Sequence, residues 1–263
     1  MRWPCVGSRS FTSSGASSPD PQGPPVGHDG WHTEVVGVEP TAGEVRTLLI
    51  GDDPLTEGLH EGLVVQGHIV ATVATRPSGG RETLAAAVDA AVALLGRTDL
   101  VVHVPRRPMD PVSLVDQATA DWVAACEAPM AEALAVVRTC RPHLGSGSRL
   151  AWVVPTVALG GAAGFAGAAA AAEGIRSLAK GAARQWGSAG IGTAVLAVSP
   201  EVAFGPDAGA PLVATTTLAD SALARPGDPV YDLAPILSLL ADPASAALTG
   251  ATLVADGGVW MSP

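Results

Sequence analysis

The stretch Glu44–Asp52, "EVRTLLIGD", decides the fold. Its apolar centre is typical of a strand buried on both faces, and the turn at Gly51 leads directly into residues 54–67, "PLTEGLHEGLVVQG", where apolar residues recur at helical spacing. A buried strand followed at once by a helix is the repeating unit of a parallel sheet. We therefore expect an α/β protein with a doubly wound parallel sheet.

The same alternation continues to the end of the chain. Further strands are expected at residues 68–75, 99–105, 148–156, 191–200 and 251–258, and helices at residues 81–96, 111–142, 160–180 and 229–240. Ligands of such sheets bind beyond the carboxyl ends of the strands. The positions at which to look for chemistry are Gly51, Pro105, Thr156 and Pro200.

Residues 1–42 differ from the rest of the chain. They are rich in Ser, Pro and Gly, and they lack both hydrophobic periodicity and the apolar segment of a secretory signal. We expect a disordered arm, or an extension that comes from a start codon placed too far upstream. We expect residues 43–263 to form one Rossmann-like domain, because a segment of this length can bury a substantial hydrophobic core.

Composition excludes several classes of protein. A formal charge of −10 and a pI near 4.9 argue against general affinity for nucleic acid or anionic membranes. Cys126 and Cys140 are expected as buried, reduced thiols, and no His, Cys, Asp or Glu grouping has metal-ligand spacing. No apolar run reaches transmembrane length. We expect a cytoplasmic protein.

Several segments carry a resemblance to a known family. They are residues 225–258, "RPGDPVYDLAPILSLLADPASAALTGATLVADGG", residues 187–201, "GSAGIGTAVLAVSPE", and residues 96–105, "GRTDLVVHVP". In this order they resemble the closing segment, a late strand and an earlier strand of the short-chain dehydrogenase/reductase family. The resemblance covers about residues 44–258 and implies a Rossmann-like fold, oxidoreduction and a nicotinamide cofactor.

The catalytic positions of that family carry other residues here. Residues 173–180, "EGIRSLAK", resemble the sequence that follows the family's Tyr-x-x-x-Lys motif. The resemblance then places the family's tyrosine at or next to Ala168, its lysine at or next to Ala172, and its serine at Pro155, with Thr156 beside it. Its helix asparagine falls near Pro129.

No shift of alignment restores these groups. The chain contains one tyrosine, Tyr231, and one lysine, Lys180, which lie far apart in sequence, and it contains no asparagine. The family's mechanism requires a phenol whose pKa is lowered by a neighbouring ammonium. Alanine supplies neither group, so we expect none of the family's catalytic residues.

The cofactor turn has changed as well. Of the family's three glycines only Gly51 remains, and the later two fall near Leu55 and Glu57, whose side chains we expect in the space of the phosphates. Asp53 before Pro54 is a good helix cap that satisfies the free amides itself, and the charges of Asp52 and Asp53 would repel a phosphate.

The segment between the first expected helix and the third expected strand supports the same interpretation. Residues 67–99 have room for one strand and one helix, so one βα unit of the family is missing, the one that contacts the adenosine half of the cofactor. We expect no cofactor.

Two functions stay open. The first is a non-catalytic protein that forms a homo-oligomer, or a hetero-oligomer with an active relative, in which the alanine-rich helix of residues 160–180 is either an interface or an internal core helix. The second is an NAD(P)-dependent oxidoreductase with unorthodox residues, Thr156 and His103. A decaying gene is a third explanation, against which the consistent strand and helix patterns argue.

Two smaller features complete the prediction. His103, Arg106 and Arg107 form either a small anion site or a solvated loop. Glu173 and Arg176, three residues apart on a helix, are expected to form a surface ion pair.

Overall fold

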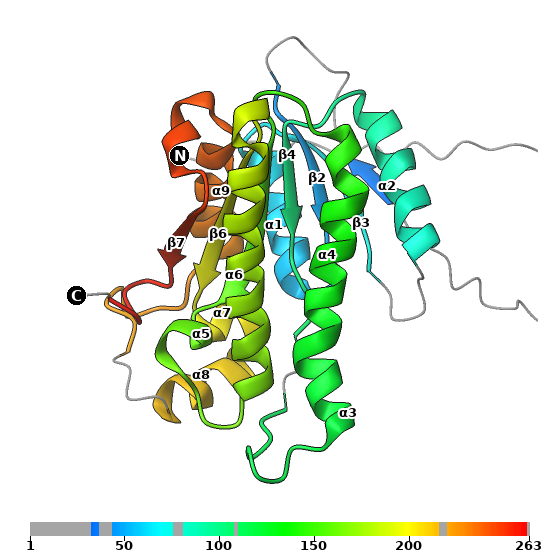
Figure 1. Ribbon diagram of the computed structural model, residues 1–263. Helices are drawn as coiled ribbons and strands as arrows, with labels where there is room; N and C mark the ends of the chain where they lie inside the picture. Colours follow the sequence, from blue (N-terminus) through cyan, green and yellow to red (C-terminus); the bar gives the residue numbers. More distant parts are fainter. Residues whose placement is uncertain (1–32, 37–43, 76–80, 108–109, 216–219, 262–263) are drawn as a thin grey trace, which may run out of the picture. The chain divides into compact units, whose positions relative to one another are not determined.

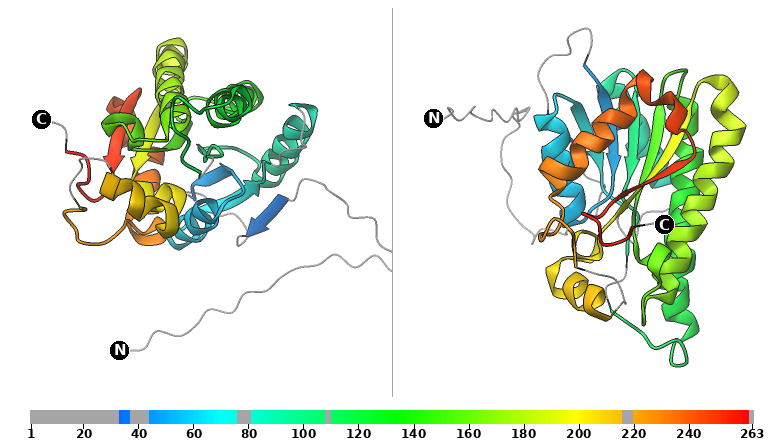
Figure 2. Two further views of the ribbon diagram at one scale, coloured as in Figure 1. Left: turned by 90° about the horizontal axis from the view of Figure 1, so that it is seen from below. Right: turned by 90° about the vertical axis from the view of Figure 1, so that its left-hand side faces the viewer.

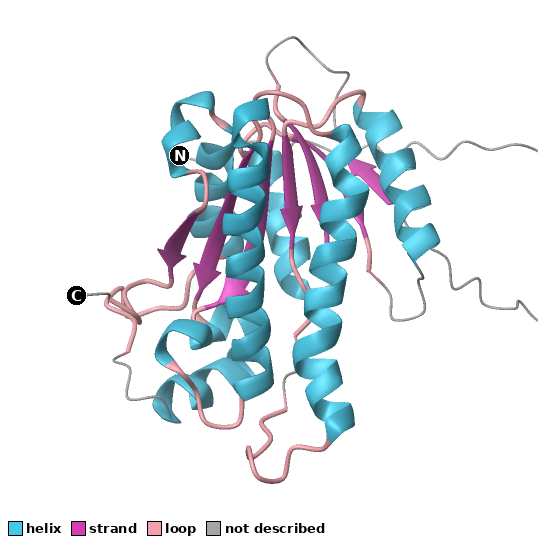
Figure 3. Ribbon diagram, viewed as in Figure 1, coloured by secondary structure: helices cyan, strands magenta, loops and turns pink. Residues whose placement is uncertain are grey.

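The computed structural model describes residues 33–36, 44–75, 81–107, 110–215 and 220–261. They form a seven-stranded sheet with helices on both faces (Figures 1 and 3). The strand order is β1-β3-β2-β4-β5-β6-β7. The strands are β1 (Thr33–Val36), β2 (Arg46–Ile50), β3 (Ile69–Val73), β4 (Leu100–His103), β5 (Arg149–Pro155), β6 (Gly192–Val198) and β7 (Ala251–Ala255).

Strands β2 to β7 are mutually parallel, as the sequence predicts. Strand β1 differs, because it pairs antiparallel with β3, from Thr33 opposite Val73 to Val36 opposite Val70. The expected extension over residues 1–42 otherwise lies outside the described residues. Between β3 and β4 the described residues hold a single helix, and beyond β3 they hold no further parallel strand; β1 lies there instead.

The helices lie in two layers around the sheet (Figure 2). One layer contains α2 (Arg81–Leu95), α4 (Ala128–Cys140) and α6 (Ala166–Trp186), and the other contains α1 (Pro54–Val65) and α9 (Ala234–Ala241). Near the carboxyl ends of the strands lie α3 (Thr119–Trp122), α5 (Val157–Gly160), α7 (Pro200–Phe204) and α8 (Pro206–Thr215).

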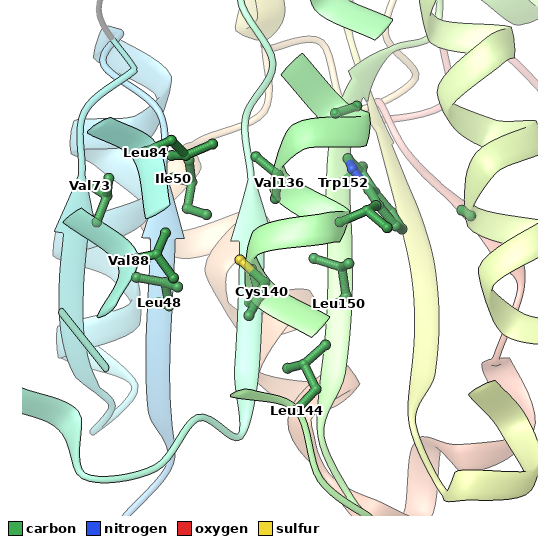
Figure 4. Packing of buried hydrophobic residues seen from close by; sticks show 14 of the residues in the cluster. Leu48, Ile50, Val73, Leu84, Val88, Val136, Cys140, Leu144, Leu150 and Trp152 are labelled. Atoms are coloured by element: carbon green, nitrogen blue, oxygen red, sulfur yellow. The ribbon is translucent and has the colours of Figure 1, made fainter. Parts of the chain in front are cut away.

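The core explains why the strands are almost wholly apolar. Alternate residues of β2 and β5 face opposite layers: Leu48, Ile50, Leu150 and Trp152 pack under α2, α4 and α6, where Cys140 also lies (Figure 4). Both faces of the sheet are covered, so neither can carry the polar alternation of a half-exposed strand. Cys126 and Cys140 are buried free thiols as predicted, and burial raises the pKa of Cys140 to about 12.

Two regions depart from the predicted elements. The helix predicted from residue 111 begins only at Thr119, because residues 111–118 form turns held by a hydrogen bond from Val112 N to the Gly164 carbonyl, 2.9 Å. Helices α7 and α8 were not predicted, since their sequence is rich in Pro and Gly and α8 contains Pro211 in its interior.

Candidate functional site

The three positions where the resemblance puts catalytic residues lie around one hollow. Pro155 at the end of β5, and Ala168 and Ala172 on α6, line a small hollow of about 20 Å³ that is open to solvent. Its other walls include Pro105, Arg106, Arg107, Ala125, Pro129 and Ile175. The structure therefore brings together residues that the sequence separates, because β5 and α6 meet at the carboxyl edge of the sheet.

The hollow is lined by few side chains that could transfer a proton. Proline and alanine have no ionisable or hydroxyl group, and the charged side chains in its lining are arginines. Lys180 lies on α6 two turns beyond Ala172, about 12 Å along the helix, with its side chain exposed. Tyr231 is 72% exposed on a different element, the turn η4 (Pro229–Leu233). Tyr231 therefore does not stand in for the family's tyrosine at Ala168, and Lys180 does not stand in for its lysine at Ala172.

Thr156 and His103 are not brought together. Both are fully buried. His103 is paired in register with Trp152, and Thr156 lies four residues further along the neighbouring strand, which is about 13 Å. Thr156 donates its backbone N–H to the Val198 carbonyl at 2.8 Å, and its hydroxyl has no hydrogen-bond partner among the described residues. The two side chains are too far apart to act on one reacting atom.

His103 belongs instead to a partly buried network with Glu132 and Arg106 that the sequence analysis missed. Its Nε2 lies 2.9 Å from Oε1 of Glu132 on α4, whose other oxygen accepts a hydrogen bond from Arg106 Nε at 3.1 Å. Burial opposes ionisation of Glu132, but the hydrogen bonds and charges of His103 and Arg106 hold its pKa below its usual range. Glu132 is 29 residues from His103 along the chain, so no local motif reveals the pair.

The turn after β2 is capped by the chain itself. Asp53 precedes α1, and its Oδ1 accepts hydrogen bonds from Thr56 N at 2.8 Å and from the Thr56 hydroxyl at 2.7 Å. Gly51 has the Thr56 hydroxyl so close that an added Cβ would lie 2.4 Å from it. The predicted cap at Asp53 with Pro54 after it is thus confirmed.

A second side chain closes the same turn. The Arg107 guanidinium binds Oδ2 of Asp53, and it donates to the Ala203 carbonyl at 3.0 Å and to the Pro105 carbonyl at 2.7 Å. Its side chain is 8% exposed. Burial lowers the pKa of Arg107, and the charge and hydrogen bond of Asp53 offset part of that effect. Arg107, in the loop after β4, is therefore buried and not solvated, and its guanidinium pairs with a carboxylate of the same chain.

These residues fit a dinucleotide phosphate poorly because Asp53 caps the helix, as expected, although the other expected reasons do not hold. Leu55 is buried in the core and Glu57 is exposed, so their side chains do not fill the turn as the sequence analysis expected. The Asp53 carboxylate occupies the amide at Thr56, and Arg107 neutralises the charge that was expected to repel a phosphate. A phosphate at this helix end would have to displace the carboxylate.

The remaining predictions concern the surface of the domain. Glu173 and Arg176 form the expected ion pair, and Arg176 also donates to the Thr252 hydroxyl at 3.1 Å. Among the residues that the structure describes, no three His, Cys, Asp or Glu side chains are grouped so that they could hold a metal ion. No described helix has the length and apolarity needed to cross a membrane.

Known structures are similar to this fold over most of their length. A dehydrogenase/reductase from Sinorhizobium meliloti 1021 is 23% identical with a TM-score of 0.70, covering 84% of this chain and 96% of its own. A 3-ketoacyl-(acyl-carrier-protein) reductase from Brucella melitensis complexed with NADH is 18% identical with a TM-score of 0.70. The match covers 83% of this chain and 99% of the reductase. A blue fluorescent protein from a metagenomic library in complex with NADPH is 19% identical, TM-score 0.70, with coverages of 83% and 99%.

Six parallel strands in this order, covered by helices on both faces, define a Rossmann-like α/β protein. The sequence model of a family described as enoyl-(acyl carrier protein) reductase matches residues 79–260, which is more than half of the chain. The chain belongs to the short-chain dehydrogenase/reductase family, a family of oxidoreductases. No curated protein matches the sequence.

Proposed function

We propose that this chain is a non-catalytic member of its family that acts as a scaffold or as a subunit of an oligomeric reductase. The observation that carries the proposal is the hollow at Pro155, Ala168 and Ala172. Reduction of a carbonyl needs a group that passes a proton to the oxygen near neutral pH. The two arginines of the hollow are engaged with Glu132 and Asp53, and guanidinium groups do not give up protons in this range.

A partner surface is available on the helices beside the hollow. Val123, Met130 and Leu134, on the continuous helical segment from α3 to α4, are 41%, 39% and 37% exposed. Apolar side chains grouped on one helical segment favour packing against another subunit. This supports a homo-oligomer, or a hetero-oligomer with an active relative.

The alanine-rich part of α6 contributes in a different way. Ala168, Ala171 and Ala172 are buried within the domain, and Gly167 approaches the π-helical turn η1 (Val123–Glu127) so closely that an added Cβ would lie 2.6 Å from that of Ala125. The small residues thus serve internal packing along this face. The surface proposed for a partner is accordingly that of α3 to α4.

A second candidate is an NAD(P)-dependent oxidoreductase with unorthodox residues. It is favoured by similar structures that hold NADH and NADPH, and by the unpaired hydroxyl of Thr156. Against it stand the separation of about 13 Å between His103 and Thr156 and the carboxylate at the turn before α1.

Two measurements separate these candidates. The first is a pull-down of the tagged full chain from its native host, followed by native mass spectrometry of the intact complex. We expect a homo-oligomer, or a complex with a second subunit that carries Tyr-x-x-x-Lys. NADH and NADPH are then titrated into the purified protein while the cofactor's fluorescence is followed. Tight, saturable binding together with turnover of a carbonyl substrate by the chain alone would replace the first proposal by the second.

A further inference from the structure

A second cavity lies beside the hollow, between the loop before α3 and the start of α6. Its volume is about 120 Å³, and it is partly open to solvent. One wall is formed by residues 110–125 and the other by the start of α6 with the residues just before it; Ala125 and Ala168 line both this cavity and the hollow. The hydrogen bond from Val112 N to the Gly164 carbonyl, 2.9 Å, ties the two walls together.

Three polar side chains line this cavity, and one of them has a buried acceptor without a donor. They are Asp110, Gln117 and Asp121. Gln117 Oε1 is buried and has no hydrogen-bond partner among the residues that the structure describes. A buried acceptor that remains unpaired is costly, and most such groups in proteins are satisfied by some partner. The cavity therefore lacks a hydrogen-bond donor that this chain does not supply.

The cavity also holds two negative charges and no positive one. Neither the Asp110 nor the Asp121 carboxylate has an ion pair or a hydrogen bond within the described part of the chain. The sequence explains this, because residues 108–137 contain no lysine or arginine, and neither do residues 157–175. The missing donor would thus be favoured if it carried a positive charge.

Two exposed aliphatic side chains lie on the same loop. Leu114 and Val115 are 70% and 90% exposed, and they belong to a turn that connects Val112 with Gln117, both of which line the cavity. Neighbouring exposed apolar side chains are typical of surfaces that contact another molecule. A ligand that combines a cationic group with an aliphatic part therefore fits the cavity and the loop beside it.

We propose that this cavity binds a guanidinium or ammonium group on an aliphatic stem, with Asp110 and Asp121 as its charge partners and Gln117 as a neutral acceptor. A guanidinium group has five N–H donors in a planar fork that suits carboxylates. Such a group belongs either to a free small amine or to the arginine or lysine side chain of a partner protein. The inference is independent of the proposed function, since it holds whether or not the chain is catalytic.

The experiment is titration calorimetry on the full chain with two probes. Agmatine represents the free amine, and the peptide acetyl-Leu-Arg-Leu-amide represents the side chain of a partner. At least one should bind saturably with a Kd below about 1 mM. The peptide should bind more tightly because Leu114 and Val115 can contact its leucines, whereas tighter binding of agmatine would assign the cavity to free amines. The same peptide with uncharged citrulline in place of arginine should not bind.

Variants of the lining residues locate the binding. Asp110→Asn, Asp121→Asn and Gln117→Leu keep the size of the side chain, and each should weaken binding by about three- to tenfold. The double variant Asp110→Asn with Asp121→Asn should abolish it. Asp116→Asn is the matched control, because it removes the same charge from an exposed side chain of the same loop that does not line the cavity. It should bind as the wild type does, and circular dichroism checks that every variant is folded.

Three results would overturn the proposal. The absence of saturable binding by both probes would mean that the cavity is no site for a cation. Equal affinities of the arginine and citrulline peptides would mean that the charge is not recognised. Equal weakening in Asp116→Asn and in the Asp110 and Asp121 variants would mean that net charge acts without a specific site.

Discussion

At the scale of single residues, the charged side chains near the hollow bind other side chains of the same chain. Arg106 and Arg107 each hold a carboxylate, Glu132 and Asp53, across elements that are far apart in sequence. Replacing Asp53 would leave the Arg107 charge buried without its partner, and replacing Arg106 would remove a partner of the largely buried Glu132, which destabilises the fold. The charged residues of the site are thus engaged in holding the fold together.

His68 gives a pH dependence that can be measured. Its ring bonds Thr47 Oγ1 at 2.8 Å and Ser238 Oγ at 2.9 Å, and burial lowers its pKa to about 4, with Asp99 acting weakly in the opposite direction. Because the folded pKa is lower than the unfolded value of about 6.5, the unfolded state takes up the proton first. The contribution of His68 to stability is complete above pH 6.5 or so and is lost as the pH falls to about 4, by about 3 kcal/mol.

Urea unfolding of the wild type and of His68→Gln between these pH values tests this prediction. The free energy of unfolding should fall more steeply for the wild type, because glutamine does not titrate, and the difference between the two curves removes the effect of the carboxylates. Parallel curves would show that His68 is protonated equally in the folded and unfolded states.

At the scale of elements, the contact between α6 and the π-helical turn η1 fixes the shape of the hollow. Gly167 touches Ala125, and Gly174 lies against Met130 of α4. A π turn inserts one residue into the helical repeat, which turns the following side chains relative to those before it. The close approach of the two helices depends on glycine at these points.

Two glycines of α6 should respond to the same substitution in opposite ways. In Gly167→Ala the new Cβ would lie 2.6 Å from that of Ala125, so the helices must separate, and we expect a loss of about 1–3 kcal/mol. In Gly181→Ala nothing lies within 4 Å, and the variant should gain about 0.5–1 kcal/mol from helix propensity. Thermal unfolding of both variants is the measurement, and equal gains would mean that the α6 contact is loose.

Much of the fold and part of the site could be predicted from the sequence. Apolar runs and helical periods identify the six parallel strands. Pro155, Ala168 and Ala172, to which the resemblance assigns the family's catalytic positions, line one hollow in the structure. The pair of Asp53 and Arg107 could not be found, since the residues are 54 positions apart and a charge pair leaves no periodicity. The same holds for Glu132.

At the scale of the whole molecule, strand β1 adds a seventh strand to the outer edge of the parallel sheet. The short segment between β3 and β4 contains one helix, and β1 pairs with β3 from the other direction. The four residue pairs of β1 and β3 are backbone contacts that join the amino-terminal part of the chain to the sheet. We expect this strand to stabilise the domain although its sequence gave no strand signal.

Two truncations that differ only by β1 measure its contribution. One begins at residue 33 and keeps the strand, and the other begins at residue 37 and removes it. The second should unfold at a lower temperature, with each kcal/mol of lost pairing lowering Tm by about 2–4 °C. Equal Tm values for the two would show that β1 adds nothing to stability.

The position of β1 also bears on how the protein behaves at high concentration. Without it, β3 would be the last strand, and this largely apolar segment, "IVATV", would leave backbone N–H and C=O groups free to pair with another chain. Exposed edges of this kind template edge-to-edge aggregation, and short outer strands that carry a charge are a common protection. β1 is four residues long, which suits such a role. We therefore expect β1, by pairing with β3, to protect this edge of the sheet against fibril-like growth.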